Sequence, residues 1–222
     1  MLRSVPLFPL NTVVFPGVTV PLSVFEDRYR AMIHQLLRIP DPEQRVFCTV
    51  AIREGYEVGE RAGHSIHRIG CLLELTDAEE RPDGSFSILA VARDRIKLIE
   101  THPADPFITA DLVTLPDVES PSAPVRAPRV RKIFVKYRDA LTKVRGYNAY
   151  PGDIPDDPTI LAWVLAATCQ LPLDEQQRLL EAETTDNRLD LLEMLMNLER
   201  EAMAAIPSLP AINLARNRWS PN

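Results

Sequence analysis

SVPLFPLNTVVFPGVTVPLSVFEDRYRAMI, residues 4–33, carries the strongest structural signals in the sequence. Phe15-Pro16-Gly17 places a proline, whose ring fixes φ, directly before a glycine, which takes positive φ without steric cost. The chain is therefore expected to reverse direction there. After Pro21, apolar and aromatic residues recur three and four positions apart, which predicts a helix over residues 26–37 with one buried face. The stretch thus predicts a strand, a tight turn, a second strand and a helix.

The rest of the first half predicts short strands separated by proline and glycine. Pro82-Asp83-Gly84 lies between two of them and predicts a hairpin turn. Several short strands with only one helix among them favour a closed or nearly closed antiparallel sheet over residues 1–116. Residues 53–69, which hold three glycines among charged residues, are expected to form an exposed hairpin or lid. The expected strands cover residues 4–7, 18–22, 46–53, 70–76, 85–91, 95–100 and 107–114.

A change of pattern divides the chain. Prolines and serines interrupt every periodicity over residues 117–127, which predicts a linker. After it the apolar spacing changes from two residues to 3.6, which predicts a helical bundle over residues 128–207, followed by a tail over residues 208–222. Pro128 suits the first position of the opening helix, because the missing N–H is not needed there.

Three further helices are expected in the second half. Asp157, followed by a proline, predicts the N-cap of a helix over residues 159–170. That helix is apolar on nearly every side, so it is expected at the centre of the bundle. Asp174 and Gln177 have the spacing of a capping box at the start of a short third helix. Thr185 is expected to cap the fourth.

Charge is unevenly placed. The formal net charge is −6, whereas residues 128–145 hold seven basic residues and one acidic residue. One interpretation is a solvated helix face that pairs with acidic neighbours. The alternative is a patch for an acidic partner or for nucleic acid, with small β-barrels as common hosts of that function. The acidic balance of the whole chain makes nucleic acid the less favoured partner.

Three cysteines, Cys48, Cys71 and Cys169, lie within apolar patterns. They are expected to be buried free thiols in a reducing compartment. The longest apolar run, residues 159–171, is shorter than the roughly 20 residues that a membrane-spanning helix needs. The N-terminus shows no secretory leader, so the sequence predicts a cytoplasmic protein without a membrane segment.

Candidate catalytic chemistry is sparse. His64, His67 and Cys71 have a spacing that could begin a zinc site, but zinc needs a fourth ligand and no second close pair is present in the sequence. Phosphate-binding, nucleophile-elbow and dinucleotide-binding motifs are missing. The carboxylate pairs at residues 79–80 and 156–157 lie where turns or caps explain them. We expect no enzyme, cofactor or metal, and a hydrolase is the least favoured alternative.

The opening residues resemble the N-terminal domain of Lon proteases. Its hallmarks are a Pro-Leu-Phe-Pro-Leu opening, a Phe-Pro-Gly turn and a Phe-Glu-x-Arg-Tyr helix, which stand here at residues 6–10, 15–17 and 25–29. Residues 70–96 are similar to the hairpin and following strand of that family, with Ala92 where many members carry glycine. Residues 171–201 resemble its closing helices, so the resemblance covers nearly the whole chain.

The resemblance implies a stand-alone substrate-binding domain without the ATPase and protease modules, with the α+β fold of that family. Its fold would be an antiparallel, PUA-like β pseudo-barrel with one inserted helix, followed by a C-terminal helical bundle. Its function would be non-catalytic binding of exposed apolar segments of unfolded or tagged proteins, in a groove between barrel and bundle. A separate protease is a possible partner, and the expected state is a monomer or a weak dimer.

Four residues are candidates for peptide binding on that basis: Phe25, Arg28, Tyr29 and Trp163. Phe25 and Tyr29 also have the i, i+4 spacing of a pair that docks the helix onto the sheet, and this structural interpretation is favoured. Arg28 and Tyr29 would contact a peptide if the helix borders a groove. Trp163 belongs to the apolar helix and is expected to be buried, whereas Trp219 lies in the tail and could fold back or serve as a linear contact.

Overall fold

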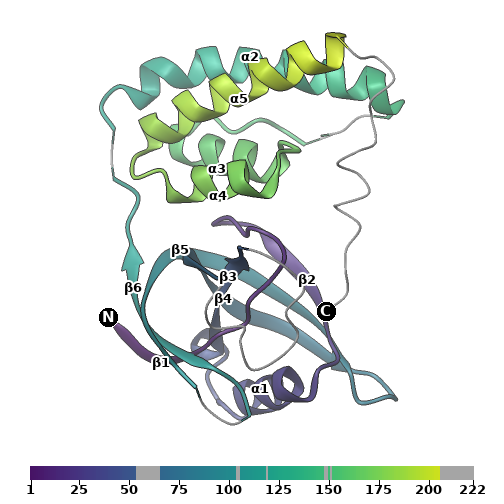
Figure 1. Ribbon diagram of the computed structural model, residues 1–222, viewed down its shortest axis with the longest axis vertical. Coiled ribbons are helices and arrows are strands. Elements are labelled where there is room, and N and C mark those ends of the chain that lie inside the picture. The colour runs from purple at the N-terminus through teal and green to yellow at the C-terminus, as the bar shows by residue number, and fades with distance from the viewer. Residues whose placement is uncertain (54–65, 104–105, 119, 148–149, 151, 206–222) are drawn as a thin grey trace. The chain divides into compact units, whose positions relative to one another are not determined.

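The computed structural model describes residues 1–53, 66–103, 106–118, 120–147, 150 and 152–205. These residues form two units, Met1–Pro116 and a second unit that begins at Asp117. The first holds the strands and the second holds the long helices (Figure 1). Most of the expected lid over residues 53–69, and the tail after residue 205, lie outside the described residues.

The first unit is a six-stranded sheet with antiparallel pairing between its strands and with one α-helix. Its strand order is β1-β6-β5-β4-β3, and β2 pairs with β5 off this path. The elements are β1 (Leu2–Pro6), β2 (Thr19–Val24), α1 (Asp27–Leu37), the 3-10 helix η1 (Pro42–Gln44), β3 (Val46–Ile52), β4 (Ile66–Glu80), β5 (Phe86–His102) and β6 (Thr109–Leu115).

The expected closed barrel is not confirmed, because the sheet is open. Among the described residues, the chain after β1 meets β3 through two isolated parallel bridges, Leu7 to Cys48 and Leu10 to Ala51. Phe8 N–H donates to the Cys48 carbonyl at 2.8 Å, Leu10 N–H donates to the Val50 carbonyl at 3.0 Å, and Ile52 N–H donates to the Leu10 carbonyl at 2.9 Å. These bridges lie outside the named strands, so β1 and β3, the two ends of the strand order, are not joined by a regular ladder.

β5 corrects one prediction. The strands expected at residues 85–91 and 95–100 are one continuous strand. Arg93, between them, pairs with Glu74 of β4, and Arg95, the first residue of the second expected strand, is buried, so these charged residues do not end the strand. The predicted turn before β5 is confirmed: Gly84 has φ 77°, and the Asp83 carboxylate accepts hydrogen bonds from the N–H and hydroxyl of Ser85 at 3.0 and 2.7 Å.

The apolar core of the sheet lies between strands distant in sequence, and α1 buries four side chains in the same unit. Covering each large side chain contributes roughly 2 kcal/mol. Gly70 allows β4 and β3 to approach closely, because a Cβ there would overlap the Thr49 carbonyl oxygen. The core residues include Val5, Leu7, Cys48, Val50, Leu72, Ile96, Leu98, Ala110 and Leu112, and those of α1 are Tyr29, Met32, Ile33 and Leu36.

Among its described residues, the second unit contains four α-helices, with α3 in contact with the other three. The Asp157 carboxylate accepts hydrogen bonds from the N–H groups of Thr159 and Ile160 at 2.9 and 2.8 Å, so the predicted N-cap of α3 is confirmed. Most of α3 is buried, as its apolar composition predicts. The helices are α2 (Ala123–Arg145), α3 (Pro158–Thr168), α4 (Leu173–Glu181) and α5 (Thr185–Ala205).

Three predicted helix starts are wrong in detail. α2 begins at Ala123, inside the stretch assigned to the linker, and contains Pro128. The first turns of α2 are stabilised by tertiary packing, because Ala123 and Ala127 are both buried. This burial outweighs the backbone hydrogen bond that is lost at Pro128. α4 has no side-chain cap, and its Gln177 donates to Glu181 at 2.8 Å instead.

The cap of α5 is shifted by one residue. The Thr184 hydroxyl, and not that of Thr185, accepts the hydrogen bond from Asn187 N–H at 3.1 Å. Thr185 is buried, and its hydroxyl lies 3.1 Å from that of Thr159 on α3. The two adjacent threonines look alike in sequence, so only the packing of Thr185 against α3 decides which of them caps the helix.

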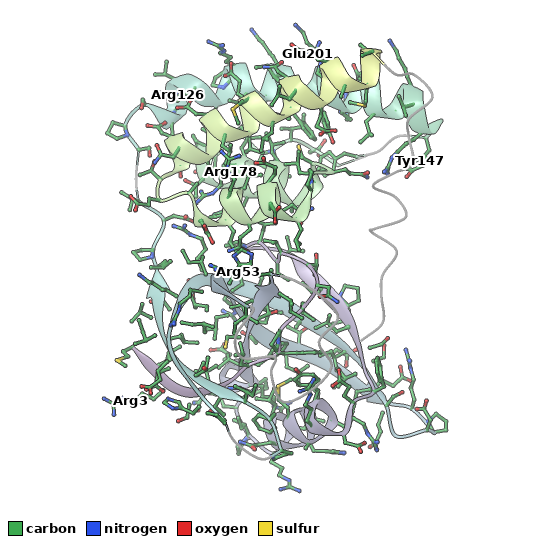
Figure 2. All side chains as sticks on the ribbon, in the orientation of Figure 1. Arg3, Arg53, Arg126, Tyr147, Arg178 and Glu201 are labelled. Atoms are coloured by element: carbon green, nitrogen blue, oxygen red, sulfur yellow. The ribbon has the colours of Figure 1, made fainter. Side chains whose placement is uncertain are left out.

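α2 and α5 run side by side and parallel (Figures 1 and 2). Their direction follows from three contacts at constant spacing along both helices: Ser122 with Asp186, Arg126 with Asp190, and Arg129 with Glu193. Exposed ion pairs contribute little individually, at about 0.5 kcal/mol each. Regular spacing nevertheless defines how the two helices align along their length.

Candidate functional site

The turn at Phe15-Pro16-Gly17 sets the direction of β2. Gly17 has φ 81° and its N–H donates to the Ala92 carbonyl of β5 at 2.9 Å, which confirms the predicted reversal. β2 then runs antiparallel to β5 with Val20, Leu22 and Val24 buried. Because side chains alternate along a strand, the residues between them lie on the opposite face of the sheet.

That opposite face carries an exposed apolar surface, which we call the outer strip. Pro21 is exposed and pairs with Leu89 of β5, whose side chain is 40% exposed. Phe25 follows directly after β2 and is 45% exposed. At about 3.3 Å per residue, Phe25 is roughly 13 Å along the chain from Pro21. The outer strip consists of Pro21, Ser23, Ser87, Leu89 and Val91 of the two paired strands, together with Phe25, which directly follows β2.

Acidic side chains border the outer strip on β4. Asp77 pairs in register with Leu89, and Glu79 pairs with Ser87. Both carboxylates are exposed. The surface is therefore apolar along β2 and β5 and negatively charged along the adjacent part of β4, and a basic group on a ligand would find favourable charge there.

The residues after Phe25 separate into buried and exposed ones. Tyr29 is buried with its ring 4.2 Å from that of Phe8, and burial raises the pKa of Tyr29 to about 12. Arg28 lies 4.6 Å over the Tyr29 ring and 2.7 Å from the Glu26 carboxylate. Tyr29 thus docks α1, as the structural interpretation predicts, whereas Phe25 does not pack into the core. Binding of peptide by Arg28 and Tyr29 stays a prediction.

Trp163 is committed to contacts inside the second unit. It is 6% exposed, its indole N–H donates to Asp117 at 2.8 Å, and the guanidinium of Arg188 lies 3.3 Å over its ring. Arg188 also donates to the carbonyl groups of Leu179 and Ala182 at 3.2 and 3.0 Å. The predicted burial of Trp163 is confirmed, and the groove expected between the two units stays a prediction.

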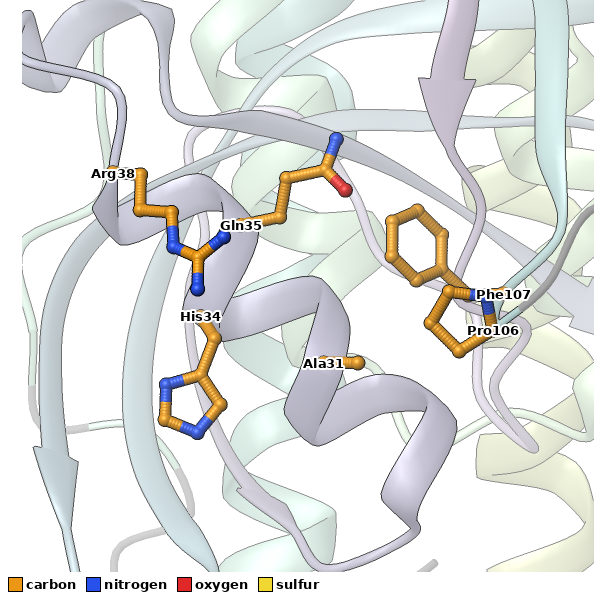
Figure 3. Close-up of a pocket in the computed structure, with 6 residues that line it drawn as sticks. All are labelled: Ala31, His34, Gln35, Arg38, Pro106 and Phe107. Carbon is orange, nitrogen blue, oxygen red and sulfur yellow. The ribbon is translucent and has the colours of Figure 1, made fainter.

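A hollow of about 430 Å³ lies beside α1 (Figure 3). Ala31 and Gln35 of the helix point towards Pro106 and Phe107, and His34 and Arg38 line the hollow as well. The His34 ring packs edge-on against Phe86 at 4.9 Å. The hollow combines an aromatic wall with polar groups and has no catalytic arrangement among the residues that line it.

Several basic residues of α2 form ion pairs or hydrogen bonds with other residues of the second unit. Arg129 pairs with Glu193, Arg131 with Asp156 at 2.6 Å, and Arg145 with Gln170. These contacts agree with the interpretation of a helix face that pairs with neighbours. Lys132, Lys136 and Lys143 remain exposed, and binding of nucleic acid at this helix stays a prediction.

The cysteines are buried free thiols, as predicted. Cys71 Sγ donates to the Val14 carbonyl at 3.1 Å, and burial raises the pKa of Cys48 to about 12. Cys71 is therefore held in the core, while His64 of the suggested zinc spacing lies outside the described residues. Within the ranges that the structure describes, no helix is long and apolar enough to cross a membrane.

Comparison with known proteins agrees with this geometry. The sequence profile of the "ATP-dependent protease La (LON) substrate-binding domain" matches residues 4–197. The chain belongs to the Lon substrate-binding domain family. Lon protease 2 of Herpetosiphon aurantiacus is 26% identical to it over 205 residues, which are 90% of this chain and 24% of that protein. The chain spans about a quarter of the length of the curated relatives it matches.

Two solved structures share the Lon-type fold. The Lon N-terminal domain protein from Xanthomonas campestris is 20% identical, with a TM-score of 0.61 over 86% of this chain and 97% of that one. The N-terminal domain of Mycobacterium avium complex Lon protease is 18% identical, with a TM-score of 0.63 over 87% and 98%. These likenesses place the open antiparallel sheet and its helices in the Lon N-terminal fold.

Pro21 and Leu89 of this Lon-type domain were missed as candidate site residues. The signal is present in the sequence, because residues 18–22 and 85–91 are both predicted strands with apolar residues on alternate positions. The pairing of these two strands across the sheet is a long-range contact that periodicity does not reveal. Only the register of β2 against β5 brings Pro21 and Leu89 opposite each other.

Proposed function

We propose that this chain is a non-catalytic protein-binding module that recognises exposed apolar segments of unfolded or tagged proteins. The observation that carries the proposal is the match of a substrate-binding family profile to residues 4–197. The outer strip supports the finer claim, since large exposed apolar side chains are typical of surfaces that meet other proteins. Of the candidate residues, Phe25 is the one that is both large and exposed.

The size of the outer strip suits weak and exchangeable binding. Covering one large apolar side chain contributes roughly 2 kcal/mol, and association itself costs several kcal/mol. Contacts with Phe25, Leu89 and Pro21 alone would therefore give weak binding, with a dissociation constant of about a millimolar or higher. Such affinity fits a module that samples many unfolded segments, because tight binding would hold one client and block the others.

The proposal extends to partners and location. Unfolded or tagged polypeptides would be the clients, and a separate protease could receive them from this domain. The module would act without a cofactor, as a monomer or weak dimer in the cytoplasm. Nucleic acid is the less favoured ligand, since several basic residues of α2 already have partners in the second unit.

Binding of an unfolded protein against its native form tests the proposal. A reduced, carboxymethylated model protein and the same protein in its native state would be titrated into the purified domain at low and at moderate salt. We expect binding of the unfolded form alone, with little change between the salts, because apolar contacts are screened far less than charges. Equal binding of both forms, or loss of binding at moderate salt, would contradict apolar recognition.

A further inference from the structure

β2 is an edge strand. Among the residues that the structure describes, β2 pairs with β5 alone. Thr19 and Pro21 are exposed and Ser23 is half-buried. Proline within a sheet is confined to positions whose N–H is not needed, so Pro21 in the middle of β2 fits an edge strand. In the part of the chain that the structure describes, the second side of β2 is therefore open to an additional strand.

The direction of the backbone groups follows from the hydrogen bonds of β5. Ala92 N–H donates to the Val18 carbonyl at 2.9 Å, so Ala92 faces β2. The Leu89 carbonyl instead accepts from the Thr76 hydroxyl of β4 at 3.1 Å, so Leu89 faces the other way. Because these directions alternate along an antiparallel strand, residues 86, 88 and 90 of β5 also face β2.

The partners of those residues on β2 are Val24, Leu22 and Val20. Their backbone groups are turned towards β5, which leaves the groups of the residues between them turned to the open edge. The free groups are the N–H of Thr19, the N–H of Ser23, and the carbonyls of Thr19, Pro21 and Ser23. The open edge thus offers two donors and three acceptors in the spacing of an extended strand.

We propose that an extended segment of an unfolded protein binds by adding a strand to the open edge of β2. This inference rests on the proposed function and names its mode of binding. Hydrogen bonds to the backbone are independent of sequence, whereas alternate side chains meet the surface beside the edge. This mode of binding suits a module with many different clients, because every client can form the same backbone hydrogen bonds.

The surface beside the edge specifies the chemistry of the segment. Side chains of the added strand on the outer face would lie next to Pro21 and Phe25, so alternate residues would be apolar. Asp77 and Glu79 lie on β4, on the far side of β5 from the open edge, so they do not select the charge of the added strand. The edge from Thr19 to Phe25 is about seven residues long, which sets the length of the bound segment.

Single N-methyl groups on a peptide backbone test strand addition directly. The probe is the fluorescently labelled peptide Lys-Leu-Thr-Phe-Thr-Leu-Lys with blocked ends, together with versions methylated at one internal amide each. Methylation removes one donor and leaves the side chains in place. We expect binding to weaken about fivefold at alternate positions and to change little at the positions between them. Equal effects at every position would overturn strand addition.

Variants of Ser23 complete the experiment. Ser23→Pro removes a donor of the open edge, and we expect about fivefold weaker binding of the unmodified peptide. Ser23→Ala keeps the N–H and changes the side chain alone, so it is the reference against which the loss caused by Ser23→Pro is measured. Equal affinity of both variants, with circular dichroism like that of the parent, would also overturn strand addition. If neither the unmodified peptide nor an unfolded protein binds at all, the proposed function fails as well, so the two failures are distinguishable.

Discussion

The guanidinium of Arg188 lies 3.3 Å over the ring of Trp163, and both side chains are buried in the second unit. The indole N–H and the guanidinium both reach Asp117, at 2.8 and 3.5 Å. Asp117 is the first residue of this unit, directly after the end of the sheet unit at Pro116. One buried cluster therefore fixes the start of the second unit to α3 and α5.

Arg188→Met should strongly destabilise the helical unit. The substitution leaves Asp117 without its buried cationic partner and removes the stacking on Trp163, at a cost of about 3 kcal/mol. Urea unfolding followed by the circular dichroism of the helices measures this change. Arg178→Met is the matched control on α4, because Arg178 is exposed and pairs with Glu175, so its loss should cost about 0.5 kcal/mol or less (Figure 2). Equal effects of both variants would contradict the role of the cluster.

Gly70→Ala should cost more than Gly17→Ala. At Gly70 a Cβ would overlap the backbone carbonyl of Thr49, so β3 and β4 must move apart, with an expected loss of about 3 kcal/mol. Gly17 has open space around it, and only its φ of 81° disfavours alanine, which costs about 1 kcal/mol. Denaturant midpoints of the two variants check the order, and the reverse order would show that the register of β3 and β4 is wrong.

The burial of Glu199 should make the stability of the folded protein depend on pH. Burial raises its pKa above the ordinary value. A carboxyl with a higher pKa in the folded state binds its proton more readily there, so folding is favoured at low pH and this contribution is lost as pH rises through the folded pKa. Glu199→Gln should therefore gain stability relative to the parent when measured at about pH 7 compared with about pH 4.

The control for this substitution is Glu201→Gln, an exposed position on the same helix (Figure 2). Its stability difference from the parent should change little between the two pH values. A pH-independent difference for Glu199→Gln, or an equal one for Glu201→Gln, would contradict the stated effect of burial.

The three thiols should resist modification in the folded protein. Cys48, Cys71 and Cys169 are buried, and burial raises the pKa of Cys48 and of Cys169, so little reactive thiolate forms. A chromogenic disulfide reagent at about pH 8 should label none of them within minutes, and all of them after unfolding in urea. Rapid labelling of the native protein would show that at least one of these side chains is accessible.

Much of the local structure could be predicted from the sequence because it depends on neighbours along the chain. The turn at Gly17, the hairpin at Gly84 and the N-cap at Asp157 each follow from residue types with fixed backbone preferences. The start of α2 could not be predicted, because burial of Ala123 and Ala127 against other helices outweighs the interruption by Pro128. At the start of α2, tertiary packing therefore outweighs the local backbone preference of the sequence.

The candidate site was predicted in part. The segment from Pro21 to Tyr29 was identified, but sequence alone did not show which of its side chains are exposed. Phe25 and Tyr29 have the same helical spacing, yet Phe25 precedes α1 and is exposed, while Tyr29 packs on Phe8. Leu89 joins the site through the pairing of β2 with β5, which is a contact between distant residues.

The most direct test of apolar recognition compares two surfaces of the same sheet. Phe25→Ser combined with Leu89→Ser removes the large side chains of the outer strip, and Ile99→Ser removes a comparably exposed side chain from another part of β5. Affinity for a reduced, unfolded model protein would be measured for the parent and for both variants. We predict that the double variant loses about tenfold or more in affinity while Ile99→Ser matches the parent. If the double variant binds the unfolded protein as tightly as the parent does, recognition of apolar segments by the outer strip is contradicted.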